Sequence, residues 1–142
     1  MLLVDARGVP LSIVVTGANR HDVSQLAVTL DALVVARPAV AARARQHLCA
    51  DAGFVGAPAK QQMLDRDYTP HVRARGEEHK QRARGQRPRR WVVEVAHSWF
   101  TRFRKLLVRY EKTHRSYMAL NMLAAAIISF RNVPAKVNII YG

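Results

Sequence analysis

The sequence has little cysteine, few acidic side chains and no long uninterrupted apolar stretch. Its one cysteine, Cys49, cannot form an internal disulfide or a cysteine zinc cluster, so folds stapled in either way are excluded. Cys49 stands in the apolar run His47 to Ala50, and we expect it to be a small buried side chain in a reducing compartment.

The chain also lacks the marks of export and of membrane insertion. Its first ten residues have no basic start and meet Asp5, which excludes a signal peptide there. The longest apolar run, residues 118–130, is interrupted by Asn121 and Ser129 and is too short to span a bilayer. We therefore expect a cytoplasmic protein with no membrane partner.

What the chain has in excess is positive charge. Only 10 Asp and Glu stand against 23 Lys and Arg, which gives a formal charge of +13 and a pI of about 11.2. Residues 73–115 alone hold 14 of the bases and 4 of the acids. So concentrated a charge indicates a polyanionic partner, most often a nucleic acid. The apolar share of 49% supports a folded core, and 142 residues make one domain or part of one.

The residue pattern alternates between strand and helix. Branched apolar residues at 2–4 and 10–16 flank a turn and predict a β-hairpin. Asp22 is predicted to be the N-cap of a helix that runs to about Val35. Further elements are predicted in the order strand 47–50, helix 57–65, strand 68–72, exposed basic loop 73–89, helix 89–112 and helix 116–130. This alternation indicates an α/β fold.

The predicted helix 89–112 carries two stripes and one acid, Glu94, on its basic side. Its apolar stripe consists of Trp99, Phe103, Leu106 and Tyr110. Its cationic stripe consists of Arg102, Lys105, Arg109 and Lys112. A carboxylate beside a cationic stripe suits a site where a metal ion meets a nucleic-acid phosphate. An ordinary amphipathic helix with a solvated charged face explains the pattern equally well.

Asp51 is the second acid of interest, because it stands at the carboxyl end of a predicted strand, where ligand sites in α/β sheets gather. Mg²⁺ prefers carboxylate oxygens, and phosphoryl transfer on DNA needs metal ions more than it needs covalent help from protein. By spacing alone, Asp51 is as well explained as a turn or cap residue. The six histidines show no metal-site spacing and are expected to be surface or core residues. Trp99 is expected in the core, whereas Trp91 is open to base stacking as well.

Four sequence blocks carry a family resemblance through their order and spacing. They are VDARGVPLSIVVTGANRHD, CADAGFVG, RRWVVEVAHSWFTRFRKLLVRYEK and YMALNMLAAAIISFR. Together they resemble the C-terminal part of the catalytic domain of DDE transposases of bacterial insertion sequences. The resemblance implies an RNase H-like fold in which three acids and Mg²⁺ (or Mn²⁺) cut and join DNA strands. Asp51 matches the second acid and Glu94 the third, and Arg90 matches an arginine that precedes this glutamate.

The chain departs from the family pattern around Glu94. Arg87 stands where the family has a tyrosine, and Thr101 stands where it has a lysine. The nearby cation would then come from Lys105 or Arg102.

The family's first acid lies on a strand upstream of the hairpin, and neither Asp5, in the turn, nor Asp22, at the predicted cap, matches it. We therefore expect a truncated RNase H-like domain over residues 1–132 that lacks its first, central strand and leaves two strand edges unpaired, with a tail at 133–142. The metal site would be incomplete and the chain inactive alone.

The expected partner is DNA at insertion-sequence ends, in the cytoplasm at the nucleoid. The expected DNA-binding residues are Arg87, Arg89, Arg90, Arg102, Lys105, Arg109 and Lys112. A second copy or a full-length transposase is a further expected partner. The alternative is a non-catalytic basic module that binds DNA or RNA. A structural RNA-binding protein of ribosomal type also fits the charge. It does not explain Glu94 within the basic helix or the order of the four blocks.

Overall fold

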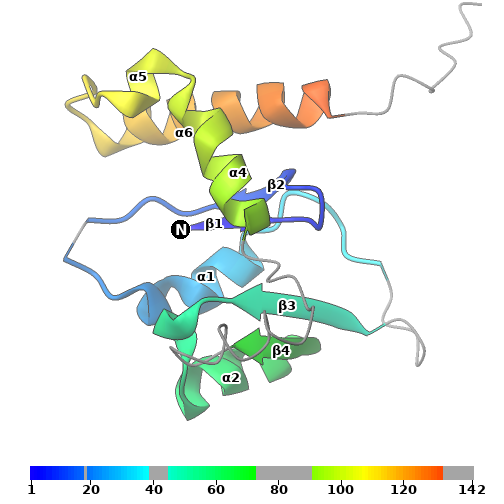
Figure 1. The fold of residues 1–142 in the computed structure, drawn as a ribbon. Helices are drawn as coiled ribbons and strands as arrows, with labels where there is room; N and C mark the ends of the chain where they lie inside the picture. The colour runs from blue at the N-terminus through cyan, green and yellow to red at the C-terminus, as the bar shows by residue number, and fades with distance from the viewer. Residues whose placement is uncertain (18, 39–44, 73–90, 133–142) are drawn as a thin grey trace, which may run out of the picture.

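The computed structural model describes residues 1–17, 19–38, 45–72 and 91–132. A β-hairpin lies in the middle, with a helical layer of α4, α5 and α6 on one side and α1 with a strand–helix–strand unit on the other (Figure 1). This is a mixed α/β chain, as predicted from the alternating pattern. The predicted basic loop 73–89 and the tail 133–142 lie outside the described residues, as do Arg87, Arg89 and Arg90.

The hairpin consists of antiparallel strands β1 (Leu2–Val4) and β2 (Pro10–Ile13), in which Leu2 pairs with Ile13. Asp5 closes the turn, because its Oδ1 accepts the backbone N–H of Arg7 at 2.8 Å and that of Val9 at 2.9 Å. The predicted hairpin is confirmed. Its second strand ends at Ile13, three residues before the predicted end.

The second sheet is a parallel pair, β3 (Gln46–Ala50) and β4 (Tyr68–Val72). Parallel strands need a crossover connection, which here contains the short 3-10 helix η2 (Ala52–Phe54) and α2 (Ala57–Leu64). Side chains alternate along β3, so Leu48 is buried while Cys49 points to the other face and is exposed. The prediction that Cys49 is buried was wrong, since the apolar run around it forms a strand with one open face.

A first core lies between this unit and the helix before it. The core contains Leu26, Leu30, Leu48, Ala59, Met63 and Tyr68. The helical segment begins as the 3-10 helix η1 (Asp22–Gln25) and continues as α1 (Leu26–Asp31), four residues shorter than predicted. The predicted cap at Asp22 was wrong, because His21 holds the N-cap position and makes no side-chain capping bond.

The basic segment does not form one helix. It forms α4 (Trp91–Thr101) and α5 (Arg104–Leu107), and Phe103 between them has an extended backbone with φ −84° and ψ 102°. Phe103 and Leu106 both pack against the second core. Tyr110, predicted on the same apolar stripe, is 71% exposed. The predicted single helix 89–112 was wrong, because α4 ends at Thr101 and α5 ends at Leu107.

The second core lies between the hairpin and the helices. It contains Ile13, Phe100, Ala124 and Ile128, with Trp99 partly buried against it as predicted for the core. Helix α6 (His114–Arg131) supplies two of these residues and is capped by Thr113, whose Oγ1 accepts the N–H of Ser116 at 3.1 Å. The predicted helix 116–130 is confirmed.

The hairpin joins the two cores. Leu3 packs against the first core and Leu2 against the second, as alternation along a strand requires. Ser12, 3% exposed, donates from its Oγ to the carbonyl of Thr29 at 2.6 Å and so fixes α1 to β2. Within the described ranges the two sheets are separate, with orders β1-β2 and β3-β4. In the same ranges, no helix is both long and apolar enough to cross a membrane.

Candidate catalytic acids and basic surface

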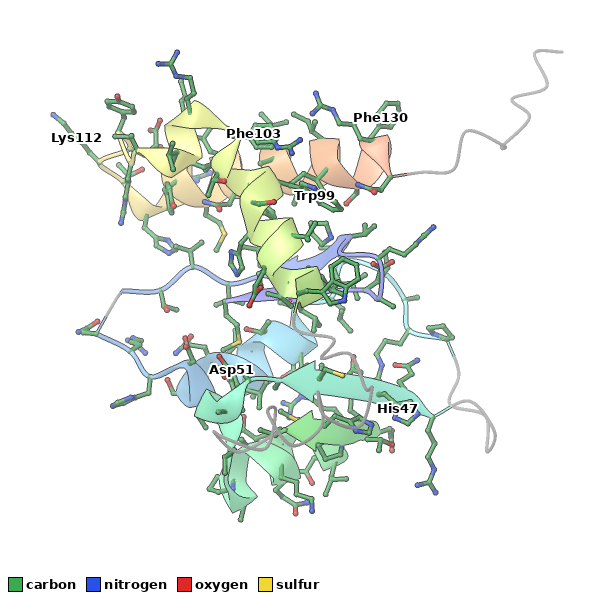
Figure 2. The ribbon with its side chains drawn as sticks, viewed as in Figure 1. His47, Asp51, Trp99, Phe103, Lys112 and Phe130 are labelled. Carbon is green, nitrogen blue, oxygen red and sulfur yellow. The ribbon has the colours of Figure 1, made fainter. Side chains whose placement is uncertain are left out.

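Asp51 stands where β3 ends, as predicted, and its side chain is exposed (Figure 2). Its Oδ1 accepts the backbone N–H of Gly53 at 2.9 Å and caps η2. The alternative of a cap residue is therefore confirmed for this side chain. Capping does not exclude a second role, because a carboxylate offers about four acceptor positions and this bond occupies one of them.

Glu94 lies in the first turn of α4 and is exposed. Ala96 and Phe100 of the same helix are buried, so Glu94 is on the side that faces away from the second core. An acid in the first turn is favourable there, because the N-terminal end of a helix carries partial positive charge. Arg90, which the resemblance matches to an arginine that precedes this glutamate, lies outside the described residues.

The two acids come from different parts of the fold, one from a strand end and one from a helix. In the part of the chain that the structure describes, no group of three or more His, Cys, Asp or Glu is arranged to hold a metal ion. A complete three-carboxylate site is thus not formed by these residues. Two exposed carboxylates still suit Mg²⁺, which commonly binds through one or two carboxylates and keeps several waters.

The described cations of the predicted DNA surface are all exposed. They are Arg102, Lys105, Arg109 and Lys112. Because α4 and α5 are separate helices, these residues do not form one straight stripe. Arg102 comes directly after α4, Lys105 lies in α5, and Arg109 and Lys112 lie in the connection to α6. Arg109 places its guanidinium 4.8 Å from the centre of the Tyr117 ring, which fixes its position on the helical layer. Lys112 lies in this layer, across the hairpin from Asp51 (Figure 2).

Comparison with known proteins decides the family. Residues 48–131 match the family model described as transposase DDE domain, and this stretch includes both Asp51 and Glu94. The match spans more than half of the chain. The chain belongs to the transposase DDE domain family.

A curated relative supports the assignment. Over 141 residues the domain is 31% identical to a protein described as a putative transposase for insertion sequence element IS402 of Burkholderia cepacia. The match covers 93% of this chain and 62% of that relative, so the transposase domain spans less than two thirds of the relative's length. No solved structure matches the domain.

The aromatic and hydroxyl side chains of α4, the helix that carries Glu94, differ in exposure and in hydrogen bonding. Trp91 is 56% exposed at the start of α4, which keeps it open to stacking on a base. Ser98 and Thr101 donate to the carbonyls of Val95 and Ser98 within the helix, at 2.6 and 2.9 Å, as ordinary helical hydroxyls do. Partial desolvation, and after it the charge of the N-terminus, lower the pKa of His97 below its usual value.

One contact in the transposase domain was not predicted from the sequence. His47 on β3 and His71 on β4 meet with Nδ1 and Nε2 only 2.7 Å apart. The signal was available in principle, because each histidine lies within a predicted strand, 47–50 or 68–72. It needed the strand register, which the sequence did not provide.

Proposed function

We propose that the chain is the later part of a transposase catalytic domain that acts on the DNA of an insertion sequence. In this role, Asp51 and Glu94 supply two of the carboxylates of its metal site. The observation that carries the proposal is the family match over residues 48–131, which includes both acids. Each acid is exposed, Asp51 at the N-cap of η2 and Glu94 in the first turn of α4, and an exposed carboxylate is open to a metal ion and a DNA phosphate.

The donor set fits Mg²⁺ or Mn²⁺. When bound, such an ion neutralises charge on the phosphate and orients the attacking and leaving oxygens. The protein's own part is to hold the carboxylates. The N–H of Gly53 holds Asp51 through Oδ1, and Glu94 projects from the first turn of α4. The exposed cations Arg102 and Lys105 follow Glu94 along the chain and would contact phosphates of the bound DNA.

The proposal includes an RNase H-like arrangement of the strands. In it, a further strand lies between β1 and β3, joins the two separate sheets into one and carries the first acid at its end. Support comes from the two-stranded sheets themselves, since both β1 and β3 then gain a partner on a second edge. Residues 1–142 contain no residue that matches this acid, so the polypeptide is proposed to bind DNA without cutting it.

Strand cleavage tests this proposal. Supercoiled DNA that carries the insertion-sequence ends is incubated with the 142-residue chain and Mg²⁺ or Mn²⁺, and nicked product is measured. We expect none, because two carboxylates are fewer than a two-metal site needs. Cleavage by the wild-type chain that disappears in the Glu94→Gln variant would contradict the proposed inactivity while supporting the role of Glu94.

A second candidate function is a non-catalytic basic module that binds DNA or RNA. The exposed Arg102, Lys105, Arg109 and Lys112 favour it independently of the acids. A role for a second copy of the chain, or for a full-length transposase as partner, belongs to either function. The two functions differ in whether a divalent ion strengthens DNA binding through the acids, since a basic module alone gains nothing from such an ion.

A further inference from the structure

The outer face of the β3–β4 pair carries the two histidines. In the parallel register His47 stands opposite Thr69, and Cys49 opposite His71. Leu48 on the other face is in the first core, so His47, Cys49 and His71 all point outward and are exposed. Figure 2 labels His47 on β3, well before the strand end at Asp51.

The two imidazole rings meet through their nitrogens. His47 Nδ1 and His71 Nε2 are 2.7 Å apart, the ring centres are 4.9 Å apart, and the ring planes are inclined by 37°. One of these nitrogens donates a hydrogen to the other, so one ring carries its hydrogen on the near nitrogen. If that hydrogen moves to the far nitrogen of its ring, both near nitrogens present lone pairs to the same point in space.

Two nitrogens placed in this way match the geometry of metal coordination. Nitrogen ligands of Zn²⁺ lie about 2.0–2.1 Å from the metal, which at coordination angles near 90–110° puts them about 3 Å apart. The rings would need to separate by only a few tenths of an ångström from their present 2.7 Å. Neutral imidazole favours Zn²⁺, Ni²⁺ and Cu²⁺, whereas Mg²⁺ prefers oxygen ligands.

We propose that His47 and His71 form a two-histidine site for a first-row transition-metal ion such as Zn²⁺ or Ni²⁺, with water completing the coordination. Among the residues that the structure describes, these two histidines are its ligands, and no group of three His, Cys, Asp or Glu is arranged to hold a metal ion there. It uses other residues than the proposed catalytic acids: His47 precedes Asp51 by four residues, about 13 Å along a strand, and His71 stands opposite Cys49, which is two residues, or about 7 Å, before Asp51. The proposal stands whether or not the chain cuts DNA.

Metal bound here would cross-link β3 to β4. The two histidines are 24 residues apart in the chain and belong to strands that are connected only through η2 and α2. An ion that binds the folded chain and not the unfolded one raises the thermal midpoint as its concentration rises. Two measurements therefore detect the site: the affinity of the ion for the chain, and the rise in thermal stability that the bound ion causes.

Calorimetric titration of the full chain with Zn²⁺ and with Ni²⁺, together with thermal unfolding at each metal concentration, tests the proposal. We expect Zn²⁺ and Ni²⁺ each to bind and to raise the thermal midpoint, and any effect of Mg²⁺, which prefers oxygen ligands, to be the same in the wild type and in the histidine variants. His47→Ala and His71→Ala should each weaken binding about tenfold or more and remove the rise. His21→Ala, which removes an exposed histidine elsewhere, is the matched control and should bind as the wild type does.

Cys49→Ser distinguishes the histidine pair from the exposed thiol beside it. We expect this variant to keep wild-type affinity. The proposal is overturned if the wild type binds neither metal, if either His47→Ala or His71→Ala binds as tightly as the His21→Ala control, or if Cys49→Ser alone abolishes binding.

Discussion

At the scale of single residues, charged side chains in this chain have local structural roles as well as the roles proposed for DNA. Asp51 caps η2 and Asp5 closes the hairpin turn, each through bonds from backbone N–H groups. Arg37 lies with its guanidinium 4.0 Å from the centre of the Tyr68 ring and donates to the carbonyl of Arg66. These contacts leave the formal charge of +13 unchanged and fix where several of the charges lie.

The ion pair between Asp31 and Arg66 gives a prediction at this scale. Arg66 donates Nε to Asp31 Oδ1 at 2.6 Å and Nη2 to Oδ2 at 2.7 Å, which joins the end of α1 to the residues after α2. These bonds lower the pKa of Asp31 below its ordinary value of 3.8. The stabilisation is therefore complete above pH 3.8 and is lost as the pH falls through the lowered pKa.

Asp31→Asn should lower the free energy of unfolding at neutral pH. It should also make the decrease in this free energy between neutral pH and pH 3 smaller than in the wild type. Urea unfolding at neutral pH and near pH 3 measures both. Because the pair is exposed to solvent, the effect should shrink in high salt. An equal loss on acidification in variant and wild type would show that the pair does not contribute.

At the scale of elements, the first core is predicted to carry much of the stability of the strand–helix–strand unit. Met63 of α2 is fully buried in it, whereas the next residue, Leu64, is 44% exposed. Met63→Ala should lower the free energy of unfolding by about 2–5 kcal/mol, because it removes buried surface and leaves a cavity.

Leu64→Ala is the matched control for Met63→Ala and should cost clearly less, since it empties no buried space. Urea unfolding of the two variants and the wild type provides the comparison. Equal losses in the two variants would contradict the position of the first core.

The elements also show what the sequence could and could not predict. Strands and helices with strong local patterns were predicted closely, among them β3, α2, β4 and α6. The break at Phe103 was not, because no proline or glycine marks it in the sequence. The exposure of Cys49 followed from strand alternation that a four-residue apolar run conceals.

The candidate site was predictable only as single residues. The strand-end position of Asp51 and the helical position of Glu94 came from local pattern and family resemblance, and both are as predicted. Whether the two carboxylates share an ion depends on contacts between distant segments, which no local pattern encodes. The same holds for the contact between His47 and His71.

At the scale of the whole molecule, the account predicts that DNA binding is dominated by phosphate contacts with the exposed cations of the helical layer. Lys105→Ala should weaken DNA binding and reduce the slope of affinity against salt by about 1 on logarithmic axes. Lys60→Ala removes the same charge from α2 and should change both quantities less. Fluorescence anisotropy with labelled DNA over a series of salt concentrations measures both slopes, and identical slopes in the two variants would contradict the proposed surface.

The central claim is that a divalent ion and a DNA phosphate meet at Asp51 and Glu94. Binding linkage makes this measurable without cleavage, because an ion that bridges protein and DNA must raise the affinity of each for the other. Without the ion, Glu94→Gln should bind DNA as tightly as the wild type or more tightly, since it removes a negative charge.

The most direct measurement is the affinity for DNA with and without Mn²⁺ in the wild type, Asp51→Asn and Glu94→Gln. We predict that Mn²⁺ tightens DNA binding by the wild type and that either substitution removes this gain. An affinity that Mn²⁺ leaves unchanged in the wild type, or raises equally in all three proteins, would contradict it.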